Sequence, residues 1–191
     1  MNDVSTTPTP AVSNTALVHY VLRARRDPAR RAALRRGAHP ATRMVARPML
    51  DQFARNHGDS EADYRFAALC ASFPKIAHNP NMAVGRALRL TKQGSNTEDG
   101  PVARRLLAAQ RQPLNRVDTT LRSMLNLAEP SSLDWTNLYW LLVYWDHPDL
   151  TTRTNRRQDL LRHYYRHSNT DDDSSPTDTD QPDSAKETKT K

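Results

Sequence analysis

The longest run of large apolar side chains spans residues 133–145 and contains all three tryptophans of the chain. Only three of its thirteen side chains are plainly polar, so a helix here would be apolar on every side. Such a helix lies in a membrane or at the centre of a core, and about 20 residues are needed to cross a bilayer. With thirteen residues, the run is too short to cross a bilayer. We therefore predict a central helix that other helices enclose, with Ser131 or Ser132 as its N-cap and Pro148 after its end.

Apolar residues recur at helical spacing along much of the remaining chain. The clearest stripe is formed by Leu114, Val117, Leu121, Met124 and Leu125, at positions i, i+3, i+7, i+10 and i+11. The other predicted helices cover residues 15–26, 29–36, 49–56, 61–73, 82–91, 102–111 and 151–165, and the stripe belongs to a helix over 113–127.

Signals for strands are missing from the sequence. No segment alternates strictly between apolar and polar residues, and the one Asp-Gly pair, at 99–100, is not flanked by two such segments that would make it a hairpin signal. Asp27 followed by Pro28 is typical of a helix start, and Gly37 of a helix end. The pattern predicts an all-α protein. Residues 1–13 are rich in Thr, Ser and Pro without an apolar period, and residues 168–191 contain no large apolar side chain, so we predict disordered tails there.

Charge divides unevenly along the chain. Of its 28 basic and 21 acidic residues, three and seven respectively lie in residues 169–191, which leaves a net charge of +11 on residues 1–168. Only two of the basic residues before position 169 are lysines, Lys75 and Lys92. A surplus of arginine favours a polyanionic partner, because the planar guanidinium can donate two hydrogen bonds to one phosphate. A high-GC genome would also raise the arginine content, and composition alone leaves both explanations open.

Catalytic and metal-binding patterns are hard to find. The sequence has no Gly-rich phosphate loop, no His-Glu-x-x-His and no paired cysteines. His163 and His167 stand at i, i+4, but no third ligand is suggested nearby, so a solvated helix end is the favoured interpretation. Cys70 lies among apolar residues and is expected to be a buried small residue rather than a nucleophile. We predict no cofactor, no metal and no small-molecule substrate.

The arginines on helices are then the main candidates for function. Each one alone is more typical of a solvated charge or an ion pair, but together they can form a track for a phosphate backbone. Most aromatic residues belong to the central helix or to Tyr164 and Tyr165, so few are available to stack on bases. We expect backbone contact, weak sequence preference and steep salt dependence.

The order of segments resembles a known family. The segments are Ala-Ala-Leu-Arg-Arg-Gly at 32–37, Phe-Ala-Ala-Leu-Cys-Ala-Ser-Phe-Pro at 66–74, Met-Ala-Val-Gly-Arg-Ala-Leu-Arg-Leu at 82–90, Val-Ala-Arg-Arg-Leu-Leu-Ala-Ala at 102–109, Leu-Asn-Arg-Val-Asp-Thr-Thr-Leu-Arg at 114–122 and the tryptophan-rich run at 133–145. Each is loose by itself, but their order and spacing over residues 17–166 are similar to those of the CasB-type small subunit of the type I-E CRISPR Cascade complex.

The resemblance implies a non-catalytic helical protein of two packed lobes, here 14–93 and 101–167. Copies would pack end to end beside other Cascade subunits and help to hold the guide RNA, the target DNA and the displaced DNA strand, stabilising the R-loop in antiviral defence. The basic positions inside matching segments become the candidate nucleic-acid contacts: Arg35, Arg36, Arg86, Arg89, Arg104, Arg105, Arg111, Arg116 and Arg122. Arg156 and Arg157 match less well, because the chain departs from the family's Trp-x-x-x-Phe-Tyr ending at residues 159–165.

Two other classes of function stay open at this point. A stand-alone helical DNA- or RNA-binding regulator would bind nucleic acid strongly alone, whereas a small subunit should bind weakly until assembled. An enzyme would need a constellation of polar residues that this sequence does not show. No secretory signal and no membrane-spanning segment is evident, so a cytoplasmic protein with no membrane partner is expected.

Overall fold

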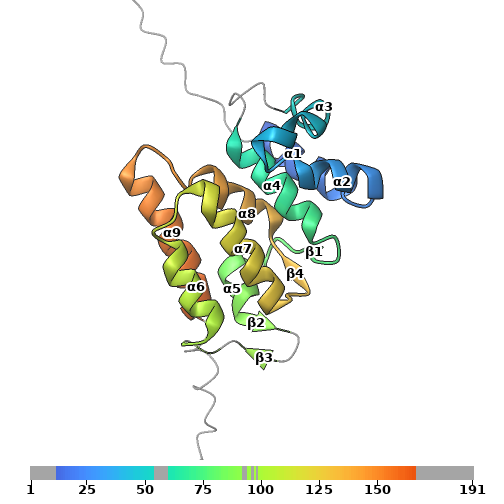
Figure 1. Cartoon of the computed structure of the whole chain (residues 1–191). Helices are drawn as coiled ribbons and strands as arrows, with labels where there is room; N and C mark the ends of the chain where they lie inside the picture. The colour runs from blue at the N-terminus through green and yellow to red at the C-terminus, as the bar shows by residue number, and fades with distance from the viewer. Residues whose placement is uncertain (1–11, 54–59, 92–93, 96, 98, 167–191) are drawn as a thin grey trace, which may run out of the picture.

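The chain folds into packed helices joined by short connections (Figure 1). The computed structural model describes residues 12–53, 60–91, 94–95, 97 and 99–166, so most of both predicted tails lies outside the described residues. The helices are α1 (Val12–Ala24), α2 (Pro28–Arg36), the 3-10 helix η1 (Pro40–Val45), α3 (Arg47–Leu50), α4 (Glu61–Ser72), α5 (Val84–Arg89), α6 (Pro101–Ala109), α7 (Leu114–Ala128), α8 (Trp135–Val143) and α9 (Leu150–Tyr165). The all-α prediction is confirmed.

Two pairs of short strands accompany the helices in the described part of the chain. β1 (Ala77–His78) pairs in parallel with β4 (Ser132–Leu133), and β2 (Leu90–Thr91) pairs antiparallel with β3 (Gly94–Ser95). The sequence did not predict them, because two residues are too few to show an alternating pattern. The β1–β4 pair ties the chain just after α4 to the start of α8.

The most enclosed helix is α4. It packs against α1, α2, α7 and α8, and all ten residues from position 62 to 71 are buried. Ala62, Ala67, Ala68 and Ala71 let these neighbours approach closely, because their side chains are small. The sequence predicts that the 133–145 segment lies at the centre. It packs on α4 and buries Trp135, but Trp140, Val143 and Tyr144 are half-exposed, so α4 and α8 share the central position.

One predicted helix cap is confirmed and another is wrong. The Asp27 carboxylate accepts hydrogen bonds from the backbone N–H groups of Ala29 and Arg30, and Pro28 begins α2, as predicted. The predicted serine cap of the tryptophan-rich helix is wrong. Asp134 caps α8 instead, because Ser132 lies in β4 and the chain before Asp134 is held in the pairing with β1.

α5 packs directly on α9. A Cβ atom added to Gly85 would overlap the carbonyl oxygen of Leu160 and lie 2.7 Å from the backbone nitrogen of Tyr164, so glycine permits this close crossing. α5 lies within the predicted N-terminal lobe, 14–93. It nevertheless packs on α7, which belongs to the predicted C-terminal lobe, 101–167. The division into lobes stays a prediction. Within the described residues, the buried side chains of all the longer helices form one continuous cluster from α1 to α9.

Candidate nucleic-acid interface

Four helices carry most of the predicted arginines, and they are almost free of acidic residues. α2, α5, α6 and α7 hold Arg35, Arg36, Arg86, Arg89, Arg104, Arg105, Arg116 and Arg122, and Arg111 lies in the turn between α6 and α7. The one carboxylate within these four helices belongs to Asp118, which is buried. Apart from the Asp146 and Asp27 carboxylates at the N-terminal ends of α7 and α2, the solvent-facing surface of these helices therefore presents guanidinium groups.

Seven of these arginines are exposed: Arg35, Arg36, Arg86, Arg104, Arg105, Arg111 and Arg116. None of the seven forms an ion pair with a carboxylate in the described part of the chain. Arg105 donates a hydrogen bond to the carbonyl oxygen of Pro101 in its own helix, at 3.3 Å. These side chains are positioned to meet an external anion.

Arginines from distant parts of the sequence come together where α2 and α7 both contact α4. Arg122 of α7 is half-buried and donates a hydrogen bond to the hydroxyl of Ser72 in α4. Burial lowers the pKa of the Arg122 guanidinium, the nearby Asp118 carboxylate raises it, and the positive charge of Arg35 on α2 lowers it again. Arg35 and Arg122 therefore lie near enough for their like charges to act on each other, on two helices that both pack against α4.

Three more predicted arginines, all near α9, make contacts within the fold. Arg157 donates to the carbonyl oxygen of Trp145 from Nε at 3.1 Å and from Nη2 at 2.9 Å, and its guanidinium lies 4.8 Å from the centre of that indole ring. It also pairs with Asp146. Arg89 is half-buried over the ring of Tyr164, and Arg156 lies over the ring of another tyrosine. Arg157 therefore fixes α9 to the preceding loop, and we leave it out of the proposed interface.

Arg25 and Arg65 contribute to the net positive charge of residues 1–168. Both are buried, so they add no charge to the surface. Arg25 is 6% exposed, donates to the carbonyl oxygen of Ile76 at 2.7 Å and lies over the ring of Trp135. Arg65 is 8% exposed and pairs with Asp118 at 2.9 Å. The position of Arg65 in the middle of an apolar helix segment was a signal for burial, but nothing local distinguishes Arg25 from its exposed neighbours.

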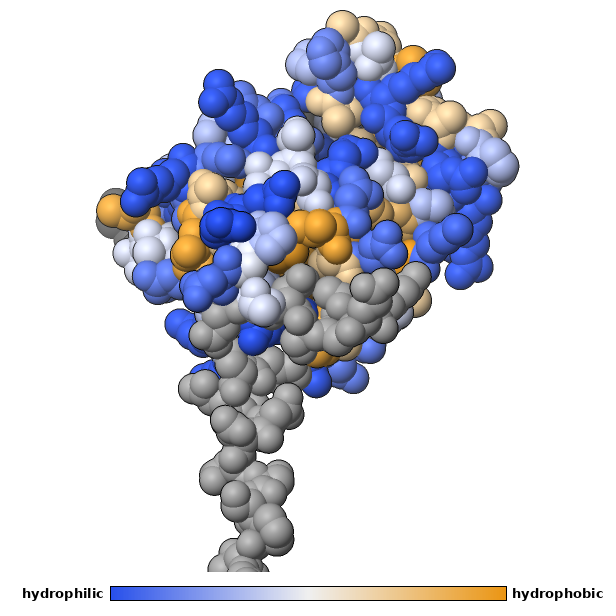
Figure 2. Space-filling model, turned by 60° about the horizontal axis from the view of Figure 1, so that its bottom comes forward, coloured by the Kyte–Doolittle hydropathy of each residue, from blue (hydrophilic) through white to orange (hydrophobic). Residues whose placement is uncertain are grey.

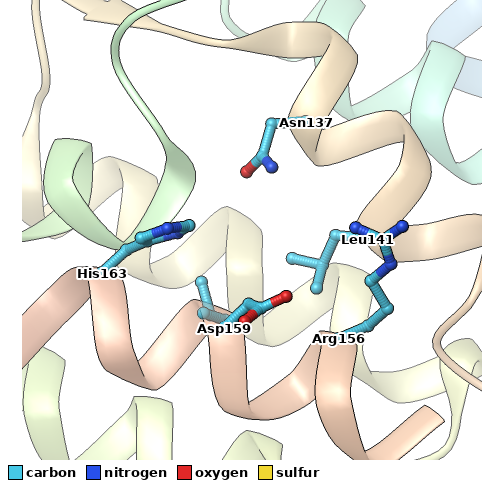
Figure 3. Close-up of a pocket in the computed structure, with 6 residues that line it drawn as sticks. Asn137, Leu141, Arg156, Asp159 and His163 are labelled. Atoms are coloured by element: carbon cyan, nitrogen blue, oxygen red, sulfur yellow. The ribbon is translucent and has the colours of Figure 1, made fainter. Parts of the chain in front are cut away.

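A small cavity of about 100 Å³ lies between α8 and α9 (Figure 3). It is lined by Asn137, Leu141, Arg156, Asp159, Leu160 and His163. Two of its polar groups already have partners: the Asn137 side-chain oxygen accepts from the backbone N–H of Val84 at 3.3 Å, and Asp159 pairs with Arg162 at 2.7 Å. The cavity therefore offers no assembled set of catalytic groups.

The side chains that could ligate a metal do not gather in the part of the chain that the structure describes. No group of three or more His, Cys, Asp or Glu side chains that could hold a metal ion occurs in the described ranges. His163, one member of the predicted i, i+4 pair, lines the cavity of Figure 3, and His167 lies outside the described residues.

The described helices also include none that is both long and apolar enough to cross a membrane.

Comparison with known proteins identifies the family. The model of the CRISPR-associated protein Cse2 family matches residues 30–165, a range that contains all eleven predicted arginines. The chain belongs to the Cse2 family. The sequence resemblance to CasB-type small subunits is therefore confirmed. Among the curated proteins, no sequence matches this chain.

Solved structures agree with this assignment. A Cse2-family protein from Thermus thermophilus is 25% identical over 80% of this chain and 97% of its own, with a TM-score of 0.62. A chain of a CRISPR RNA-guided surveillance complex is 27% identical over 81% of this chain and 92% of its own, also with a TM-score of 0.62. CasB from M. ruber is 22% identical and supports the fold alone, with a TM-score of 0.61 over 83% of this chain and 95% of its own.

Proposed function

We propose that this Cse2-family chain is a non-catalytic small subunit of a type I-E CRISPR Cascade complex that holds nucleic-acid backbones through exposed arginines. Its partners would be the guide RNA, the target DNA, the displaced DNA strand, other Cascade subunits and further copies of itself packed end to end. It would act in the cytoplasm, in antiviral defence. Support for assembly comes from the similar chain found in an RNA-guided surveillance complex.

The observation that carries the proposed contact is the charge of α2, α5, α6 and α7. Their exposed arginines, such as Arg104 and Arg116, face solvent with no acidic residue beside them on the same helices. A phosphate backbone needs positive charge at regular intervals and no pattern of base-edge donors and acceptors. The arrangement therefore supports binding that depends on charge and salt more than on sequence.

The aromatic residues support the same mode of binding. All three Trp, six Tyr and three Phe residues of the chain are described, and every one is buried or half-buried. Proteins that bind single strands through their bases stack them on accessible aromatic rings. Without such a platform, the contact proposed here falls on phosphates.

Backbone contacts can act on strand opening. Exchanging a DNA duplex for an RNA–DNA hybrid is nearly balanced in free energy, so protein contacts to the separated strands can shift the equilibrium. Arginines that bind the displaced strand stabilise the open state, because they make that contact only after the strands separate. We propose this as the role of the small subunit in R-loop formation.

The test is to reverse one charge at a time in the reconstituted complex. Arg104→Glu and Arg116→Glu should each weaken target-DNA binding about threefold or more and reduce the slope of log K against log salt by about one. Lys75→Glu is the matched control, because Lys75 is exposed but lies outside the four helices. Equal behaviour of all three variants would contradict the proposed interface, and cleavage of DNA or RNA by the purified chain would contradict the non-catalytic role.

A further inference from the structure

The segment that follows α9 has a charge opposite to that of the candidate interface. Residues 171–183 contain six aspartates and no basic residue, and all three lysines of the last 23 residues lie after position 183. The match to the Cse2 family ends at residue 165, so this acidic segment is an addition to the family's common part. The described structure ends at Arg166, and residues 167–170 connect Arg166 to the segment in the sequence.

The end of α9 lies beside the start of α6. The hydroxyl of Tyr164 donates a hydrogen bond to the carbonyl oxygen of Thr97 at 3.2 Å, and Thr97 comes shortly before Pro101, the first residue of α6. Arg104 and Arg105 follow within the next turn, and both are exposed. Figure 1 shows this end of α9 and the start of α6 at the same end of the molecule.

α5 adds further positive charge at the same place. Gly85 packs against the backbone of α9 at residues 160–164, and the exposed Arg86 is its neighbour in sequence. Arg166, the C-cap of α9, is exposed as well, and so is Arg162 in the last turn, which pairs with Asp159. Figure 2 brings this end of the molecule forward and shows a surface that is hydrophilic over most of its area. The last described residues before the acidic segment therefore lie among exposed arginines of α5, α6 and the end of α9.

The segment is long enough to reach these arginines. An extended chain spans about 3.3–3.6 Å per residue, so Asp171 to Asp173 can lie roughly 16–25 Å from Arg166. The nine residues of α6 form a helix about 14 Å long, which is within that distance. A segment tethered this close has an effective concentration in the millimolar range, so weak ionic contacts are enough to occupy the surface.

We propose that residues 171–183 bind back to the arginines of α5, α6 and the end of α9 and compete there with nucleic acid. This inference rests on the proposed function, because it assigns a regulator to the same surface. In the free chain the segment would suppress binding to arbitrary nucleic acid. In the assembled complex the denser charge of a positioned phosphate backbone would displace it.

The first test compares binding of a 30-nucleotide single-stranded DNA at about 0.1 M salt. A chain ending at Ser168, and a full-length chain with all six aspartates of 171–183 changed to Asn, should each bind about three- to tenfold more tightly than the parent. The difference in DNA affinity between these chains and the parent should narrow as salt is raised, because salt screens electrostatic interactions between exposed charges. The matched control ends at Asp183, keeps the acidic run and should show no gain in affinity.

The second test measures the contact directly. Cys70 is fully buried and unavailable to labelling reagents, so Ser175→Cys provides one reactive thiol for a spin label. The label should broaden backbone amide signals around Arg86 and Arg104 in the parent sequence. The same label in the chain with six asparagines should leave those signals sharp.

Outcomes separate this proposal from the proposed function. Affinities equal within about twofold for the parent and both acid-free chains, or no broadening near α5 and α6, would overturn autoinhibition by the acidic segment. The absence of DNA binding by the chain ending at Ser168 would overturn autoinhibition as well. The proposed function survives all of these results if Arg104→Glu still weakens the assembled complex, and fails by itself if that variant has no effect.

Discussion

Replacing Asp118 by alanine would remove the carboxylate that faces a buried arginine across the contact between α4 and α7. Nη1 of Arg65 lies 2.9 Å from Oδ1 of Asp118, and the two side chains are 10% and 7% exposed. The same Nη1 donates to the carbonyl oxygen of Asn115 at 3.3 Å. This ion pair holds α7, and with it the exposed Arg116, against the most enclosed helix of the fold.

The expected loss follows from the partners that remain. Removing one member of a buried ion pair costs about 3–5 kcal/mol, because the other charge stays buried without compensation. Glu61 still accepts a hydrogen bond from Nε of Arg65 at 2.7 Å, which keeps part of the guanidinium paired. We therefore expect Asp118→Ala to lower the free energy of unfolding by about 3 kcal/mol, at the lower end of that range.

Urea denaturation followed by far-ultraviolet circular dichroism would measure this loss. For a chain of this size, 1 kcal/mol corresponds to about 2–4 °C in the melting temperature, so a decrease of about 6–12 °C should accompany it. Asp118→Asn keeps an acceptor facing Arg65 and should cost less, about 1–2 kcal/mol. Arg162→Ala is the exposed control. It breaks the pair with Asp159, which is half-exposed, and should cost under about 0.5 kcal/mol.

A double-mutant cycle decides whether the pairing itself is responsible. The cycle compares Arg65→Met, Asp118→Leu and the variant with both changes. The double variant buries no charge at this site, so it should be more stable than Asp118→Leu alone. A loss below about 1 kcal/mol for Asp118→Ala would refute the reasoning. Strictly additive effects of the two single changes would refute it as well, since they would mean that the two residues do not interact.

Three further outcomes are expected. Gly85→Ala should destabilise the protein by about 1–3 kcal/mol in urea denaturation, because the added Cβ would overlap the backbone of α9. Burial raises the pKa of Glu61, but hydrogen bonds from Arg65 and Arg43 more than offset this and hold it below its usual 4.5. Glu61 thus stabilises the fold above about pH 4.5, and the difference in melting temperature between the parent and Glu61→Gln should disappear as pH falls through the lowered pKa. Burial raises the pKa of the Cys70 thiol to about 12, so a thiol reagent should react with it near neutral pH only after unfolding.

Most of the helical framework could be predicted from the sequence, because its signals are local. The stripe that includes Val117, Leu121 and Met124 faces the core as expected, and Asp27 caps α2. Side chains three and four residues apart share a face of a helix whatever surrounds it, so their spacing is enough to predict burial. The order of loosely matching segments was also enough to predict the Cse2 family, which the family model confirms.

The distribution of charge needed the tertiary structure. Arg25, Arg65 and Arg157 contribute to the sequence's positive surplus in the same way as Arg104 and Arg116, yet the first three bind carbonyl oxygens or carboxylates within the fold. Whether an arginine is available depends on partners supplied by distant segments, and no local pattern specifies those partners. The nucleic-acid contacts of the remaining arginines are still a prediction.

The sequence by itself determined that the chain is helical, rich in arginine and similar to Cse2 proteins, because periodicity, composition and segment order are properties of neighbours along the chain. The tertiary structure decided that Arg35 and Arg122 lie near each other on two helices, that α5 crosses α9 at Gly85, and that the end of α9 lies beside the start of α6. These juxtapositions arise from the packing of elements far apart in sequence, where side-chain size and burial select the neighbours.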